Sequence, residues 1–205
     1  MNKPIQIWLF VAVIVVIPVS LFGIVKWYQQ RFESLPLLGP EAHVIGSYSF
    51  TDQYGAALNT GEWENKITVA GYFFTHCPVV CPKIVEQLKR VQGSAGKDIS
   101  LYLFSVDPER DDVESLQRYA RRLNIQDNWF LITGDKKELY RFARKELLIV
   151  ATDGDGGDSD FIHSENLVLI DPLRRIRGYY KGTDAGEADR LIMDIKKLEK
   201  EFAQR

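Results

Sequence analysis

Two cysteines and three histidines are the residues of this 205-residue chain that are best suited to bind a soft metal ion or to exchange disulfides. Cys77 and Cys81 lie in the segment THCPVVCPK, residues 75–83. A spacing of four residues on a helix places both sulfurs on one face. The implied Cα separation of roughly 6 Å falls in the range that a disulfide permits. The pair is therefore compatible with a disulfide or with one metal ion held between the sulfurs.

The residues around the pair predict the start of a helix. Pro78 suits the first helical turn, where its missing N–H group costs nothing, so we expect Cys77 at or beside the N-cap and Cys81 one turn later. Free N–H groups and a partial positive charge at a helix start stabilise thiolate over thiol. We expect both cysteines to be reactive rather than structural.

Copper is the metal that best fits these donors. Two thiolates suit Cu(I), and a nearby imidazole would add a third ligand and admit Cu(II), whereas structural zinc normally takes four protein ligands. His163 precedes a predicted strand and is one candidate for the imidazole. His76 is adjacent to Cys77, and His43 lies further toward the amino terminus. Spacing alone does not choose among the three histidines.

Strand-like and helix-like stretches alternate along most of the chain, as hydrophobic periodicity indicates. A predicted strand at 67–74 leads through the cysteines into a helix at 82–91, and further strands are expected at 99–106 and 129–133, with helices at 113–123 and 136–146. A hairpin at 166–170 and 176–180 precedes a closing helix at 185–202. Apolar strands with helices between them predict an α/β fold whose sheet is covered on both faces.

The amino terminus predicts a membrane anchor. Residues 5–25 carry no charge, and a 21-residue helix matches the roughly 30 Å hydrocarbon core of a bilayer. We expect a tail at 1–4, the transmembrane anchor at 5–25, a linker at 26–46 and one domain at 47–205. A cleaved signal peptide is the alternative, but such a segment has a shorter apolar region and a small-residue cleavage site. The lack of an Arg- and Ser-rich leader favours a bacterial cytoplasmic membrane, and the cysteine pair favours a domain facing the periplasm or cell exterior.

Composition excludes one class of partner. A formal net charge of -2 leaves no basic excess for neutralising a phosphate backbone, so no nucleic acid is expected to bind. The Asp- and Gly-rich residues 153–160 do not match a calcium-binding loop and are expected to form a solvated loop.

Five stretches of the sequence, spread over most of the chain after the linker, match a known pattern: YFFTHCPVVCPK, FSVDPERDD, NWFLITGD, FIHS and GYYKG. In these stretches the chain resembles the Sco (or SenC) family of membrane-anchored copper-binding proteins, assembly factors for the binuclear copper site of cytochrome c oxidase. This resemblance implies a thioredoxin-like fold with a single N-terminal transmembrane helix. It also implies one copper ion per chain, bound by Cys77, Cys81 and His163, with the imidazole joining in the Cu(II) state.

The resemblance implies a metallochaperone that receives copper from an unidentified donor and delivers it to the copper-site subunit of cytochrome c oxidase. The alternative is a thiol-disulfide oxidoreductase that reduces the cysteines of that subunit, with Cys77 attacking and Cys81 resolving. A peroxidase or redox sensor is a third, weaker possibility. Asp107, in SVDPERDD, is expected either to cap a turn or to act near the metal.

Overall fold

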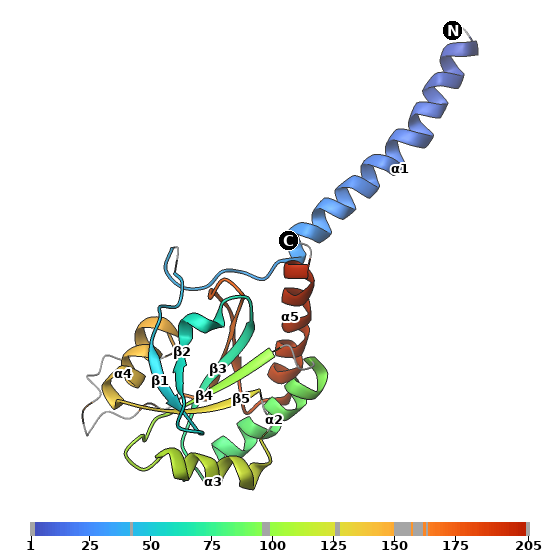
Figure 1. Ribbon diagram of the computed structural model, residues 1–205. Coiled ribbons are helices and arrows are strands. Elements are labelled where there is room, and N and C mark those ends of the chain that lie inside the picture. The colour runs from blue at the N-terminus through green and yellow to red at the C-terminus, as the bar shows by residue number, and fades with distance from the viewer. Residues whose placement is uncertain are drawn as a thin grey trace. The chain divides into compact units, whose positions relative to one another are not determined.

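The computed structural model describes residues 3–41, 43–95, 99–125, 128–149, 157, 162 and 164–203. The chain divides into two compact units, Met1–Leu35 and Pro36–Arg205, and the division falls inside the predicted linker at 26–46. The first unit contains α1 (Lys3–Glu33), which includes the predicted anchor at 5–25 (Figure 1). A search of the described residues finds no helix that combines the length and apolarity needed to span a bilayer.

The second unit is built on one seven-stranded sheet with strand order β2-β1-β5-β4-β3-β6-β7. The central strands β3 (Ile67–Phe73), β4 (Ile99–Ser105) and β5 (Trp129–Thr133) run parallel. The outer strands β1 (Ser49–Asp52), β2 (Ala57–Asn59), β6 (Asn166–Ile170) and β7 (Ile176–Lys181) pair antiparallel. Every residue of β3 is buried, as expected for a strand covered on both faces.

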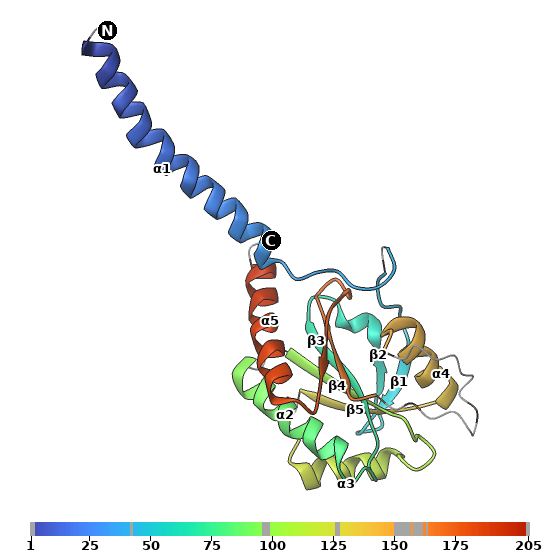
Figure 2. The ribbon, with the colours of Figure 1, turned by 180° about the vertical axis from the view of Figure 1, so that it is seen from behind.

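Helices cover both faces of the sheet, which confirms the predicted α/β layering. The helices α2 (Val80–Ala95), α3 (Val113–Leu123) and α5 (Ala185–Ala203) lie on one side, and α4 (Lys136–Arg141) lies on the other (Figures 1 and 2). The α2 and α5 helices also contact each other. The predicted helix at 136–146 is divided, because after α4 the chain continues as a π-helical turn, Phe142–Glu146.

Aromatic side chains fill the core on the α4 side of the sheet. Phe50, Phe104 and Phe142 meet one another with ring centroids 5.0–5.4 Å apart. Trp63 contacts the same cluster and is fully buried. Ile45 is also fully buried, and the Leu38 N–H donates to the Ile176 carbonyl at 3.0 Å. Part of the predicted linker is therefore packed against the domain.

The parallel register brings two chemically rich loops together. Phe73 of β3 is paired with Ser105 of β4, so both strands end at the same edge of the sheet. The cysteine loop follows β3, and the DPERDD segment follows β4. Binding sites in open α/β sheets form at such carboxyl ends of strands. The cysteine loop and the DPERDD segment both lie at this edge.

Candidate metal centre

Cys77 lies in the turn between β3 and α2. Its N–H group donates to the Phe74 carbonyl at 3.3 Å, and α2 begins three residues later, at Val80. The predicted N-cap position is therefore wrong, and Pro78 lies before the helix rather than in its first turn. The expected interaction with the helix start is retained, because the Cys81 N–H donates to the Cys77 Sγ at 3.2 Å.

The two thiols are adjacent but chemically unequal. Both cysteines are free and buried, Cys77 at 8% exposure and Cys81 at 3%. Burial opposes ionisation of Cys77, but hydrogen bonds from Cys81 and from the N–H groups of Val79 and Val80 outweigh it, and the pKa of Cys77 is lowered. Burial, with smaller contributions from the neighbouring Cys77 and Asp111, raises the pKa of Cys81 to about 12. The prediction of two activated thiols therefore holds for Cys77 alone.

A cavity of about 330 Å³ adjoins the cysteines. Its wall is largely apolar and combines the cysteine loop with the ends of β3 and β4 and with residues near the start of β6: Tyr72, Phe73, Phe74, Cys77, Val80, Cys81, Ile84, Val106, Ile162, Ser164 and Glu165. His163 lies outside the described residues. The residues before and after it in the sequence, Ile162 and Ser164, both line this cavity.

The other two histidines are engaged elsewhere. His76 is exposed, lies within hydrogen-bonding distance of the Thr75 hydroxyl, and lines a separate groove beside α3. The His43 Nε2 is 2.8 Å from the Glu146 carbonyl oxygen. Within the described part of the chain, no three His, Cys, Asp or Glu side chains converge as a metal-binding group. Among the described residues, Cys77 and Cys81 are thus the sulfur donors that line the cavity.

Asp111 is a residue of this site that the sequence pattern did not single out. Its carboxylate is fully buried and accepts hydrogen bonds from the Thr75 hydroxyl at 2.5 Å and the Ser105 hydroxyl at 2.6 Å. The Thr75 N–H lies 3.2 and 3.3 Å from its two oxygens. Asp111 therefore joins the end of β4 to the loop that carries Cys77. Asp111 lies in the DPERDD segment, four residues after Asp107, which the sequence pattern favoured.

Asp107 takes part in a turn through its backbone, whereas the expectation was a carboxylate that caps the turn or acts near the metal. Its carbonyl accepts from the N–H groups of Arg110 and Asp111, and its carboxylate lies 3.7 Å from the Arg110 Nε. Its N–H group donates to the Ser105 hydroxyl at 3.0 Å. Asp107 is not among the residues that line the cavity.

Known proteins are similar to this chain in sequence. The SCO1/SenC family model matches residues 38–200. A SCO1 homologue from Bacillus subtilis is 26% identical over 162 residues, which cover 77% of this chain and 83% of the relative. A relative from Stutzerimonas stutzeri that is named as a copper-binding protein is 28% identical over 152 residues, which cover 71% of this chain and 72% of that protein. The chain spans about half of two longer mitochondrial relatives, from Arabidopsis thaliana and Homo sapiens.

Solved structures agree with these relatives. A SCO1/SenC family lipoprotein from Bacillus anthracis superposes with a TM-score of 0.68 at 27% identity, covering 80% of this chain and 99% of that protein. BsSco, described as a member of the Sco family of cytochrome c oxidase assembly proteins with a disulfide switch, has the same fold, with a TM-score of 0.65 at 24% identity over 79% of this chain and 96% of its own. Since the family model covers most of the sequence and the fold agrees, the chain belongs to the SCO1/SenC family.

Proposed function

We propose that this protein is a membrane-anchored copper chaperone that carries one copper ion on Cys77, Cys81 and His163 and delivers it to the copper-site subunit of cytochrome c oxidase during assembly. One observation carries the proposal: both cysteines and both sequence neighbours of His163 line a single cavity. Copper is the cargo in this scheme, received from a donor and released to the oxidase subunit.

The sulfur pair supplies the soft part of the ligand set. Cys77, with its lowered pKa, offers a thiolate. Cys81 holds its proton more tightly, so the incoming ion must displace that proton, as metal binding to thiols does in general. Two adjacent sulfurs in a largely apolar wall suit Cu(I) better than a hard, strongly hydrated cation.

His163 is the proposed third ligand. Its two neighbours in the sequence, Ile162 and Ser164, line the cavity that adjoins the cysteines, which supports this choice of histidine. An imidazole added to two thiolates makes the site suitable for Cu(II) as well as Cu(I). Loss of the imidazole on reduction would leave the ion on two sulfurs, one of which an incoming thiolate of the acceptor can replace.

Copper retention by the reduced, full-length chain tests the ligand set. We expect Cys77→Ser and Cys81→Ser to lose both Cu(I) and Cu(II) during dialysis, and His163→Ala to lose Cu(II) while keeping Cu(I). His76→Ala is the matched control and should retain both ions, since its imidazole lines a different groove. Cu(II) retention by His163→Ala equal to that of the unmodified chain would refute the proposed third ligand.

The anchor and the orientation of the domain are also part of the proposal. The uncharged residues 5–25 support a bilayer span, and the linked domain would then face the periplasm or cell exterior from a bacterial cytoplasmic membrane. The protein should stay in the membrane pellet after carbonate extraction. Protease added to intact spheroplasts should remove the domain. A protein that stays fully protected until the cells are lysed would overturn the orientation.

Thiol-disulfide exchange is the second candidate, favoured by the contrast between the two thiols. The Cys77 thiolate would attack a target disulfide and release one target thiolate, and Cys81 would then lose its proton and attack the mixed disulfide. The chain would end with a Cys77–Cys81 disulfide and the target with two thiols, a two-electron transfer. In that case His163→Ala would reduce a disulfide peptide at the unmodified rate, and copper loading of the oxidase subunit would not depend on His163.

A further inference from the structure

A second groove lies beside the cysteine loop, on the α3 side. It has a volume of about 340 Å³ and is lined by Thr75, His76, Ser115, Arg118, Tyr119 and Arg122. None of these residues lines the cavity that adjoins the sulfurs. The groove and that cavity therefore flank the turn carrying Cys77 with different chemistry, the groove with cationic and hydroxyl groups and the cavity with a largely apolar wall.

Positive charge on the groove comes from two arginines of α3. Arg118 is paired with Glu114 and also donates to the Ser115 hydroxyl. Arg122 lies with its guanidinium carbon 5.1 Å from the centre of the Tyr119 ring. Among the described residues, no carboxylate lies within ion-pair distance of Arg122. The groove thus holds one guanidinium whose charge is not balanced by a carboxylate of the described residues.

A buried hydroxyl gives the second, independent observation. Tyr119 is 3% exposed, its ring packs on Phe73 with the ring centroids 5.4 Å apart, and its hydroxyl has no hydrogen-bond partner among the described residues. Buried polar groups without partners are uncommon and costly. Burial and, to a smaller extent, the nearby Cys81 raise the pKa of Tyr119, so the phenol stays protonated.

We propose that this groove binds a carboxylate side chain of a protein partner through the Arg122 guanidinium, and that a small shift of the groove on binding lets the buried Tyr119 hydroxyl donate to it. One unbalanced guanidinium matches one negative charge, and Glu114 beside Arg118 disfavours a doubly charged phosphate. Because Thr75 and His76 also belong to the loop that carries Cys77, an acidic side chain held here would lie next to the metal-binding turn. This last step rests on the proposed function, whereas carboxylate binding does not.

Titration of the full-length, metal-free chain in detergent micelles tests the groove, with arginine Nε and backbone amide NMR signals as the readout. The probes are a blocked glutamate, a blocked glutamine of the same shape and inorganic phosphate. We expect the glutamate to shift the signals of Arg122, Ser115 and the cysteine loop, and the glutamine to leave them in place. Equal signal shifts with the blocked glutamate and the blocked glutamine would overturn the proposal. Tighter binding of phosphate than of glutamate would also overturn it.

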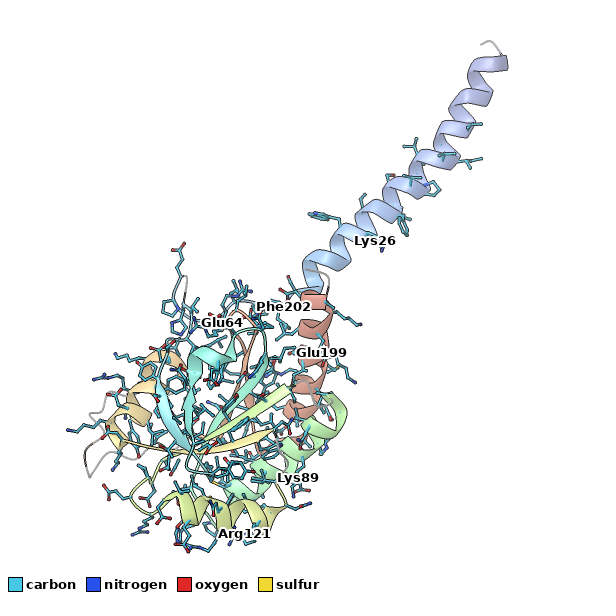
Figure 3. The ribbon with its side chains drawn as sticks, in the orientation of Figure 1. Lys26, Glu64, Lys89, Arg121, Glu199 and Phe202 are labelled. Carbon is cyan, nitrogen blue, oxygen red and sulfur yellow. The ribbon has the colours of Figure 1, made fainter. Side chains whose placement is uncertain are left out.

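Two variants assign the binding to the named groups. Arg122→Gln should weaken glutamate binding about tenfold, the loss of one charge-assisted hydrogen bond. Arg121→Gln is the matched control: Arg121 is the neighbouring exposed arginine of α3, labelled in Figure 3, and does not line this groove, so affinity should be unchanged. Affinity unchanged in Arg122→Gln, or lost equally in both variants, would refute the assignment.

Tyr119→Phe separates binding from folding. Since the hydroxyl has no partner in the described part of the chain, its removal should leave the thermal unfolding midpoint unchanged or slightly higher while weakening glutamate binding. A variant that binds glutamate as tightly as the unmodified chain would exclude the phenol from the site. Copper retention is measured separately, so a failure of the groove leaves the metal proposal untouched.

Discussion

Replacing Asp111 by Asn should loosen the joint between β4 and the cysteine loop. The carboxylate of Asp111 is fully buried and accepts from the Thr75 hydroxyl, the Thr75 N–H and the Ser105 hydroxyl. Asn keeps the shape and one acceptor oxygen, but it loses the charge and places an NH₂ group where the second oxygen stood. The substitution therefore weakens three bonds without opening a cavity.

The magnitude follows from the difference between charged and neutral hydrogen bonds. A bond to a charged group contributes about 1.5–3 kcal/mol and a neutral one about 0.5–1.5 kcal/mol. Three bonds would lose about 3 kcal/mol in sum, and relief of the buried charge offsets part of that, so we expect about 2 kcal/mol. Asp111→Ala leaves the Thr75 and Ser105 donors without an acceptor. It should therefore lower the free energy of unfolding by more, about 3–5 kcal/mol.

Equilibrium urea unfolding of the reduced chain, followed by tryptophan fluorescence, measures this effect. With a slope of about 2 kcal/mol per M, the Asp111→Asn midpoint should fall by about 1 M at unchanged slope. Asp112→Asn is the matched control next in sequence: Asp112 caps α3 by accepting from the Ser115 N–H at 2.8 Å, and Asn caps helices equally well. Its midpoint should not change. Equal midpoints for the Asp111→Asn and Asp112→Asn variants would refute the reasoning.

Two further predictions concern the thiols and a buried ion pair. In single-Cys variants, the alkylation rate of Cys77 should begin to rise with pH below the ordinary thiol pKa of about 8.5. Alkylation of Cys81 should stay slow until far more alkaline pH, and coincident pH profiles for the two thiols would contradict the assigned pKa shifts. Arg177 is 3% exposed and is paired with the fully buried Asp171 and with Glu201. We expect Arg177→Ala to lower the free energy of unfolding in urea by about 3–5 kcal/mol. Arg175→Ala should cost less because Arg175 is more exposed and Arg177 still pairs with Asp171; equal losses would show that burial does not set the difference.

Sequence periodicity located most elements because their apolar residues repeat at the spacing of the element they form. The strand at 129–133 and the helix at 113–123 were predicted at their observed bounds. The short strands β1 and β2 were missed, since each has a single buried large apolar residue, Phe50 and Leu58. Phe50 is buried against Phe104 and Phe142, which are distant in the sequence, and local patterns cannot reveal such contacts.

The sequence placed Cys77 and Cys81 together at a strand-to-helix turn, because a spacing of four residues next to a helix start keeps two side chains close. Their inequality was decided by the tertiary structure. Only folding buries Cys81 near the carboxylate of Asp111, thirty residues away, and leaves Cys77 facing the N–H groups of Val79 and Val80. Solvent exclusion and charges from distant segments set a pKa, and neither is a property of the local sequence.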